Sequence, residues 1–332
     1  MACGASAINI PPVIFLLPIF KKTYLPISTN IMAILSLQDI SKNYGRVQAL
    51  QHVSFEVPSS TVYGILGPNG SGKTTLLGIV MDVLKASSGN YLWNGKPGSN
   101  QQRRQTGTLL ETPNFYHYLS ASDNLKISAR IKGRGLQDID AVLQTVNLYE
   151  RKHSAFSTFS LGMKQRLAIA AALLGNPDVL VFDEPTNGLD PAGIAEIREL
   201  IMQLNKAGKT IIMASHILDE VEKVCTHVAI IQKGILKTAG PVSEVLQSSA
   251  ANNFLLAAAD LAALQHILQQ MPGVQNVQPA GEALLLTCNE NITAEQVNRF
   301  CFENGMVLSK LIVKKTSLET RFLEITGKQS DR

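Results

Sequence analysis

One segment of this sequence limits the possible folds more than any other. Residues 67–75 read G-P-N-G-S-G-K-T-T, between a short apolar run at residues 62–66 and a second one at residues 76–81. The first run predicts a buried strand and the second an apolar helix, so the glycines lie in the turn that joins them. Glycines let backbone amides converge on an anion, and a helix start adds partial positive charge. The segment therefore predicts a phosphate-binding loop in an α/β sheet.

The side chains of this loop indicate a nucleoside triphosphate bound together with a magnesium ion. Lys73 can reach the β- and γ-phosphates, and the Thr74 hydroxyl can ligate Mg²⁺. All positions of the G-x-x-x-x-G-K-T pattern match, together with both flanks, which argues against a glycine-rich turn without a nucleotide. The residues expected to contact ATP are Gly67, Pro68, Asn69, Gly70, Ser71, Gly72, Lys73, Thr74 and Thr75.

A second predicted strand ends on two carboxylates. The apolar run at residues 179–182 predicts a buried parallel strand, and Asp183 and Glu184 follow it directly. Open α/β sheets bind ligands at the carboxyl ends of their strands. We expect Asp183 to hold Mg²⁺, directly or through water, and Glu184 to polarise the attacking water as general base. The phosphate loop earlier in the chain weighs against the alternative, two solvated acids in a turn.

Length and composition set wider bounds. A chain of 332 residues predicts roughly two domains, at about 150 residues each. The net charge of +4 is too weak over this length to make nucleic acid the main partner. The four cysteines stand at no metal-binding spacing, which indicates free thiols in a reducing compartment and not a disulfide framework.

A third motif narrows the class. Residues 159–167 read F-S-L-G-M-K-Q-R-L, and Ser160 is a candidate N-cap for an apolar helix that runs on to Gly175. The segment resembles the LSGGQ-type signature of ABC ATPases, which contacts the ATP held by the phosphate loop of the opposite subunit. The resemblance therefore implies an ATP-sandwich dimer, of identical or different ATP-binding subunits. The signature residues implied to contact ATP are Ser160, Leu161, Gly162 and Met163.

Further elements of the same family follow in order over about residues 33–245. Tyr44 lies where the family has an adenine-stacking aromatic, although an aromatic on a hairpin can serve packing alone. Residues 187–191 resemble the D-loop, which implies an ATP contact for Asp190. His216 follows an apolar strand and resembles the switch histidine that contacts the γ-phosphate. The resemblance thus makes Glu184 and His216 the catalytic residues.

Two motifs depart from the family's usual pattern. Glu111 stands where the family has the Q-loop glutamine, and Leu161 and Met163 replace a glycine and a glutamine of the signature. These variants are similar to the bacitracin-resistance and lantibiotic-immunity branch of ABC-2-type exporters. The resemblance implies Thr74, Glu111 and Asp183 as metal ligands, and we hypothesise that Glu111 also couples the site to a membrane subunit. The alternative is a shifted register in which Glu111 is a surface acid.

The expected domains begin at Met32. The apolar run at residues 8–20 is too short to span a bilayer, contains three prolines and has no basic residue before it. We expect residues 1–31 to be a disordered or mis-started leader, with a weak membrane-surface anchor as the alternative. Residues 32–247 are the expected ABC ATP-binding domain, with a helical subdomain at about residues 112–175.

Residues 248–332 predict a linker and a small α+β domain. The predicted order βαββαβ suggests a ferredoxin-like plait, followed by a final helix within residues 317–327. This part shows no catalytic constellation, and a regulatory or dimer-supporting role is our hypothesis for it.

The expected fold is an α/β P-loop NTPase of the ABC type, with a mixed sheet core and a helical subdomain. The resemblance implies an ATP-hydrolysing subunit that energises a multi-subunit exporter. With ATP and Mg²⁺, it would act on the cytoplasmic face of the cell membrane beside a separate polytopic permease. Phe115, Tyr116, Tyr118 and Leu119 are candidate contacts for that permease, or ordinary subdomain core.

Two rival functions stay open at this stage. A soluble ABC ATPase acting on nucleic acid or ribosomes is disfavoured by the single phosphate loop, the small net charge and the lack of a long coiled-coil insertion. An ATP-dependent scaffold that does not hydrolyse is disfavoured by the presence of Lys73, Asp183, Glu184 and His216. The sequence does not name the cargo.

Overall fold

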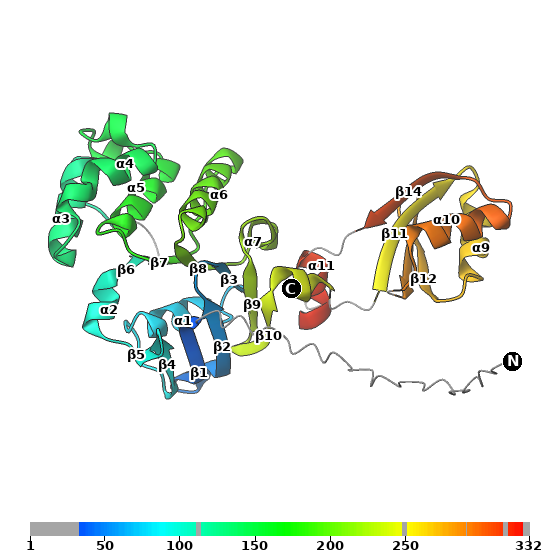
Figure 1. Ribbon diagram of the computed structural model, residues 1–332, viewed down its shortest axis with the longest axis horizontal. Helices are drawn as coiled ribbons and strands as arrows, with labels where there is room; N and C mark the ends of the chain where they lie inside the picture. Colours follow the sequence, from blue (N-terminus) through cyan, green and yellow to red (C-terminus); the bar gives the residue numbers. More distant parts are fainter. Residues whose placement is uncertain (1–32, 111–113, 248–250, 290, 315–317, 328–332) are drawn as a thin grey trace, which may run out of the picture. The chain divides into compact units, whose positions relative to one another are not determined.

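The structure, a computed structural model, describes residues 33–110, 114–247, 251–289, 291–314 and 318–327 (Figure 1). The expected leader at residues 1–31 and the residue Glu111 therefore lie outside the described residues. Within the described ranges, no helix combines the length and the apolar character that crossing a bilayer requires.

A ten-stranded mixed sheet forms the core of the first domain (Figure 1). Its strand order is β5-β4-β1-β2-β10-β9-β3-β8-β7-β6. The parallel set comprises β3 (Val62–Leu66), β6 (Thr106–Leu109), β7 (Val179–Asp183), β8 (Thr210–Ser215) and β9 (His227–Gln232). The other strands are β1 (Ala33–Tyr44), β2 (Val47–Pro58), β4 (Ser88–Trp93), β5 (Lys96–Pro97) and β10 (Ile235–Pro241). Every residue of β3, β7 and β8 is buried, as central parallel strands require, so their carboxyl ends form a rigid edge for the site.

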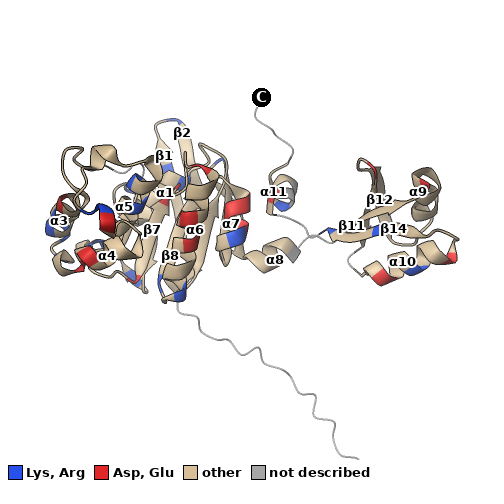
Figure 2. Ribbon diagram, turned by 90° about the horizontal axis from the view of Figure 1, so that it is seen from above, with Lys and Arg blue, Asp and Glu red and all other residues tan. Residues whose placement is uncertain are grey.

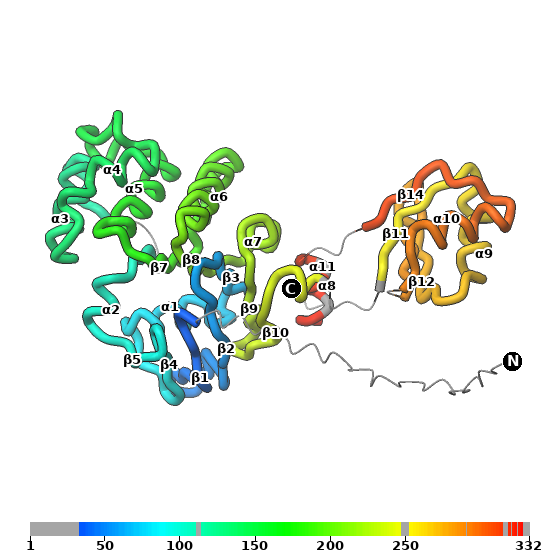
Figure 3. Tube along the Cα trace, in the orientation of Figure 1, coloured from blue at the N-terminus to red at the C-terminus, as the bar shows by residue number. Residues whose placement is uncertain are grey.

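The helices of the first domain form two groups, one on the sheet and one in a helical subdomain. Helices α1, α6 and α7 pack on the sheet, and α5 packs on its edge strand β6 while also joining α3 and α4 in a helical subdomain (Figure 3). Leu125, Leu143 and Leu167 join the three subdomain helices in one core and are fully buried. The helices are α1 (Lys73–Val80), α2 (Asn100–Gln105), α3 (Ala121–Lys132), α4 (Ile139–Thr145), α5 (Leu161–Leu173), α6 (Pro191–Lys206), α7 (Leu218–Val224) and α8 (Val242–Gln247). Short 3₁₀ turns lie at Leu136–Asp138, Tyr149–Arg151 and Phe156–Thr158.

Polar N-caps fix where the two helices that flank β7 begin. The Ser160 hydroxyl accepts the backbone N–H of Met163 at 3.3 Å, which starts α5. The Asp190 carboxylate accepts the N–H of Gly193 at 2.9 Å, and Pro191 supplies the first residue of α6. Such caps satisfy backbone donors that a helix start leaves unpaired.

A second, smaller domain has its own sheet and its own core. Its four antiparallel strands lie in the order β12-β13-β11-β14. Along the chain the elements are β11 (Ala251–Ala258), α9 (Leu261–Gln269), β12 (Val274–Pro279), β13 (Leu284–Asn289), α10 (Ala294–Glu303) and β14 (Leu308–Lys314). Fully buried Leu256, Leu264 and Val297 belong to a cluster separate from the core of the first domain. A capping box at Thr293 and Gln296 starts α10.

The last helix, α11 (Leu318–Thr326), packs on the first domain although it follows the second one in the chain. The backbone N–H of Leu318 donates to Glu222 Oε2 at 2.8 Å, and the Gln232 side chain donates to the Thr326 carbonyl at 3.0 Å. Leu318 is fully buried in the core of the first domain. The small domain is therefore bracketed by α8 and α11, which pack against each other.

Candidate active site

The phosphate loop joins β3 to α1 in a backbone shape that glycine makes possible. A Cβ on Gly67 would lie 2.2 Å from the Ile231 carbonyl oxygen and 2.4 Å from Ser71 Oγ. Gly72, the residue before α1, has a φ of 107°, which side-chain-bearing residues rarely adopt. The loop is thus held tightly against β9 and leads directly into α1.

A cavity of about 320 Å³ lies over this loop and collects residues from distant parts of the chain. Its lining consists of Ala49, Asn69, Gly70, Gly72, Lys73, Thr74, Thr75, Glu184, Asn187 and His216. The fold therefore brings much of the phosphate loop together with both predicted catalytic residues. Ala49 and Asn187 were not predicted as site residues. Asn187 stands three positions after Glu184, which could have signalled its place, whereas nothing in the sequence around Ala49 does so.

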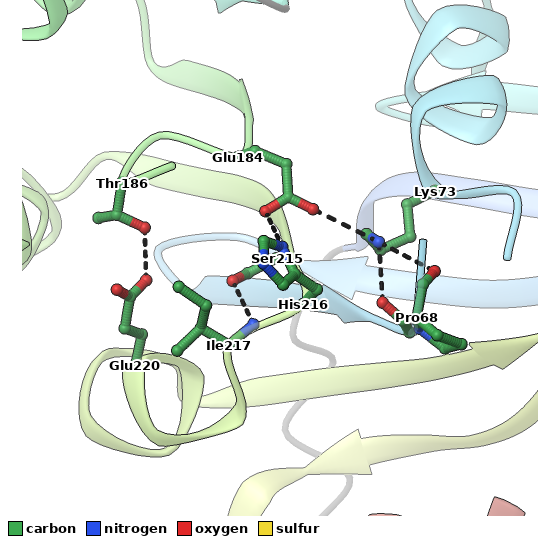
Figure 4. A network of polar contacts seen from close by, with 9 residues as sticks. Pro68, Lys73, Glu184, Thr186, Ser215, His216, Ile217 and Glu220 are labelled. Carbon is green, nitrogen blue, oxygen red and sulfur yellow. Dashed lines mark hydrogen bonds and ion pairs between the residues drawn. The ribbon is translucent and has the colours of Figure 1, made fainter. Parts of the chain in front are cut away.

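Lys73 is buried and bound within its own loop. Its ammonium group donates to the carbonyl oxygens of Gly67 at 2.8 Å and Pro68 at 3.3 Å, and it lies 3.4 Å from Glu184 Oε1 (Figure 4). A buried ammonium requires such partners. Phosphate oxygens entering the cavity can replace these contacts one for one, because they are charged acceptors for the same three donors.

Glu184 lies between Lys73 and His216. His216 Nδ1 and Glu184 Oε2 are 2.7 Å apart, so the histidine orients the carboxylate (Figure 4). The Glu184 backbone has a φ of 50°, a left-handed conformation that is costly for a residue other than glycine. Its N–H donates to the Ala214 carbonyl at 3.0 Å, which ties the start of this turn to β8.

The donor set fits a hard divalent cation that arrives with its nucleotide. Thr74 lines the cavity at the start of α1, whereas Asp183, which ends the buried strand β7 directly before Glu184, is itself buried and does not line the cavity; both offer oxygen donors. No group of three or more His, Cys, Asp or Glu side chains that could hold a metal occurs among the described residues. Two protein ligands are what Mg²⁺ commonly uses when phosphates and water complete its octahedron.

The signature residues lie elsewhere. As far as the described residues show, Ser160, Leu161, Gly162 and Met163 do not line the cavity over the phosphate loop. Leu161 has 44% of its surface exposed, and a Cβ on Gly162 would meet only Leu189 Cδ2, at 4.0 Å. The start of α5 is thus exposed on the surface of this chain, with room for a ligand or partner beside it.

Tyr44 and Asp190 also stand apart from the cavity. Tyr44 ends β1 with 46% of its surface exposed, and the Lys42 ammonium lies 5.1 Å from its ring centre. Asp190 caps α6, so its carboxylate has a structural partner within the chain. Both residues are available for ligand contact only from outside the cavity that Lys73 and Glu184 line.

A phosphate loop on a parallel strand, faced by a carboxylate and a histidine from neighbouring strand ends, defines a P-loop nucleotide hydrolase. The family model described as ABC transporter matches residues 50–187. The bacitracin transport ATP-binding protein BcrA of Bacillus licheniformis is 34% identical over 300 residues, which cover 89% of this chain and 97% of that protein. The lantibiotic transport ATP-binding protein SrtF of Streptococcus pyogenes is 40% identical over 200 residues, covering 60% of this chain and 87% of that protein.

Solved structures agree with these relatives. The structure of cbiO1 from Clostridium perfringens, part of the ABC transporter complex cbiONQ, superposes with a TM-score of 0.58 at 30% identity. It covers 65% of this chain and 91% of that one. The chain belongs to the ATP-binding proteins of ABC transporters. It is the ATP-binding and ATP-hydrolysing subunit of such a transporter, and the predicted family, its bacitracin and lantibiotic relatives and the predicted α/β fold class are confirmed.

Proposed function

We propose that this chain drives an exporter as one half of an ATP-binding dimer that holds two ATP molecules between its subunits. One observation carries the proposal: the start of α5 is exposed, offers the small Gly162, and does not line the phosphate-loop cavity of its own chain. A helix start favours anions. A partner placed head to tail can bring it onto the ATP held by Lys73. That partner is a second copy or another ATP-binding subunit.

The residues of the cavity divide the chemical work. ATP phosphates would draw Lys73 away from the loop carbonyls and from Glu184. The released carboxylate of Glu184 then accepts a proton from the attacking water, while His216 keeps it oriented. Mg²⁺, held by Thr74 and Asp183, would neutralise charge on the phosphates. A metal contact from Glu111 stays a hypothesis, because this residue lies outside the described ranges.

Two outer residues complete the proposed nucleotide site. Tyr44 is exposed enough to stack on the adenine ring. Asp190 fixes the start of α6 and would face the partner's ATP, while Asn187 of the preceding loop lines the cavity of its own chain. Both roles rest on the family resemblance together with exposure.

A groove in the helical subdomain is the proposed docking place for a polytopic membrane permease. A cavity of about 360 Å³ is lined by Asn114, Phe115, Tyr116, Asn124, Ile127, Ser128 and Ile131. Tyr116, Tyr118 and Ile131 have between half and four-fifths of their surfaces exposed. Exposed aromatic and aliphatic side chains around a groove favour a protein partner. The subunit would then lie on the cytoplasmic face of the membrane, without nucleic acid as a partner.

The relatives suggest the cargo class, and the small domain suggests regulation. Since the relatives are named for bacitracin and lantibiotic transport, a peptide antibiotic is the proposed cargo. The strand order β12-β13-β11-β14 with two helices supports a ferredoxin-like description of the second domain. We assign it a regulatory or dimer-supporting role, within the proposed division at residues 32–247 and 248–332.

Replacing the proposed base tests the dimer and the chemistry together. Glu184→Gln should lower the ATPase rate by about 100-fold or more, because the amide cannot accept the proton. It should also trap an ATP-bound dimer, which light scattering after size exclusion detects. Glu303→Gln makes the same acid-to-amide change at an exposed position of α10 and should behave as wild type. A persistent monomer of E184Q in ATP would overturn the sandwich dimer.

The permease is tested by its own experiment. The tagged protein is purified in mild detergent from native membranes, and co-purifying chains are identified by mass spectrometry. A polytopic membrane protein in stoichiometric amount is the expected result. Recovery from the soluble fraction alone, or with ribosomal proteins, would overturn the transporter partnership while leaving the ATP chemistry intact.

A further inference from the structure

We propose that Glu220 of α7 is a positioning residue for ATP hydrolysis, which acts by holding Thr186 and thereby the turn that carries Glu184. The proposal rests on the proposed role of Glu184 as the base. Glu220 and Thr186 lie outside the cavity and were not among the predicted site residues. The effect of Thr186 on the reaction would therefore pass through the backbone of the turn, whereas Glu220 also lies close enough for its charge to act on Glu184 and His216.

The contact between the two side chains is short and buried. The Thr186 hydroxyl donates to Glu220 Oε2 at 2.5 Å, and each residue has only 4% of its surface exposed (Figure 4). Among the described residues, Oε1 of Glu220 finds no hydrogen-bond partner. A buried carboxylate with one unsatisfied oxygen is costly for stability, since a buried polar group without a partner keeps its full desolvation penalty. Fold stability alone therefore does not explain this buried hydrogen-bonded pair.

Two side-chain bridges join the same pair of chain segments. Glu184 to His216 links the residues directly after β7 and β8, and Thr186 to Glu220 links the residues two and four positions further along. The Ser215 hydroxyl accepts the N–H of Ile217 at 3.0 Å and so shapes the turn into α7. With both bridges made, neither segment can rotate about the other. Without the second bridge, the turn after Glu184 would lose its side-chain attachment to α7 and would be held by the backbone bond from Glu184 to Ala214 and by the contacts of the carboxylate itself.

The strained backbone of Glu184 needs such support. Its left-handed conformation persists only if the surroundings over-determine it. Hydrogen bonds from Asn187 N–H to the Glu184 carbonyl and from Leu189 N–H to the Thr186 carbonyl, at 3.1 and 3.2 Å, close the turn on itself. The Thr186 hydroxyl is the turn's attachment to α7. Removing it should let the turn relax and move the carboxylate off its hydrolytic position.

Glu220 also interacts electrostatically with the catalytic pair. Burial and, to a smaller extent, the charge of Glu184 raise the pKa of the Glu220 carboxyl above its ordinary value, against the opposing effects of the Thr186 bond and the charges of Arg198 and His216. Helix α7 carries both acidic and basic residues (Figure 2). Its acids are Asp219, Glu220 and Glu222, and its basic residue is Lys223. Asp219 has 71% of its side chain exposed and pairs with Lys223, so it offers a matched comparison on the same helix.

The test separates positioning from a merely structural role by comparing kcat with KM. Thr186→Val keeps the shape of the side chain and removes the hydroxyl. It should lower kcat by about 10- to 100-fold, with the KM for ATP changed by less than about 3-fold. Thr186→Ser and Glu220→Gln each keep a hydrogen bond between the two positions. Each should therefore keep most of the wild-type rate, unlike Thr186→Val. Asp219→Asn should match wild type in both constants.

A double variant decides between this proposal and the proposed function. If Thr186 acts through Glu184, then T186V adds little further loss in an E184Q background. A full additional loss, or an unchanged kcat in T186V, overturns the positioning role. If E184Q itself keeps wild-type hydrolysis, the base assignment fails and the positioning role falls with it. Urea unfolding of each variant, with a midpoint near that of wild type, verifies that the rates come from folded protein.

Discussion

At Gly162 the protein keeps a glycine that its own chain does not require. A Cβ there would meet only Leu189 Cδ2, at an ordinary contact distance of 4.0 Å, whereas at Gly67 it would lie 2.2 Å from a backbone oxygen. Different contacts therefore require a glycine at the two positions. Gly67 is fixed by packing inside the molecule, while the small size of Gly162 at the start of α5 has to serve something that approaches from outside.

The substitution Gly162→Asp separates stability from activity at this position. A carboxylate in the first turn of α5 is favourable for the helix by about 0.3–1 kcal/mol, because it complements the helix dipole. The same charge would repel the phosphates of a partner's ATP. We expect an unchanged or slightly raised urea midpoint, unchanged ATP affinity of the monomer, and loss of ATPase activity and ATP-driven dimers. Retained ATPase activity would contradict the role given to the start of α5.

Among the elements, contiguous patterns were predictable and long-range contacts were not. The apolar runs gave β3 and β7 nearly to the residue, and the N-cap at Ser160 gave the start of α5. These features depend on neighbours within a few positions. The bridge from Thr186 to Glu220 joins residues 34 positions apart, and its existence depends on β7 and β8 being adjacent strands. Sequence patterns do not report strand order.

The left-handed backbone of Glu184 and the return of α11 escaped prediction for related reasons. A positive φ is expected at glycine, so nothing in the sequence marks a glutamate for it. An amphipathic helix after a small domain looks like part of that domain. Only the fold shows that Leu318 fills a place in the core of the first domain. The site's contiguous motifs were thus predicted, while their positioning and the participation of Ala49 and Asn187 were not.

One contact between subdomain helices predicts a pH dependence of stability. The Lys132 ammonium, at the end of α3, donates to the carbonyls of Ala171 and Ala172 in the last turn of α5, at 2.7 and 3.2 Å. Burial lowers the pKa of Lys132 to about 8, from an ordinary value of 10.5. Between these two values the unfolded chain binds more protons than the folded one. The contribution of Lys132 to stability therefore rises as pH increases through that window.

A pair of glutamine variants measures this dependence. The unfolding free energy of wild type minus that of Lys132→Gln should increase between pH 7.5 and 9.5, by at most about 1.4 kcal/mol per pH unit. Arg130→Gln loses the same charge at an exposed position of α3 and should show no such change. Urea titrations at the two pH values give the comparison. A difference that does not vary with pH would mean that Lys132 keeps its ordinary pKa in the folded chain.

For the whole molecule, the small domain is an insertion between two helices that belong to the first domain. α8 and α11 pack against each other, and α11 also packs on α7, the helix of Glu220. The glutamates at positions 220 and 222 divide the contacts of α7, since one holds Thr186 and the other accepts the Leu318 N–H. An event in the small domain that displaced α11 would therefore reach the helix that follows His216.

This arrangement changes how the role of the small domain has to be tested. Truncating the chain after residue 249 also removes α11, so lost activity would not implicate the small domain.

Leu318→Ala in the full chain isolates the helix instead. It should destabilise the first domain by about 2–5 kcal/mol, because a fully buried leucine is removed from the core. Leu323→Ala, where half of the leucine surface is exposed, should lower the unfolding free energy clearly less.

Replacing residues 251–314 with a flexible glycine and serine linker keeps α11 and removes only the small domain. Unfolding of the first domain near its wild-type urea midpoint, with altered ATPase rates, is then the expected result. Wild-type rates in that variant would show that the small domain does not regulate hydrolysis, and equal losses for L318A and L323A would show that α11 is not part of the core.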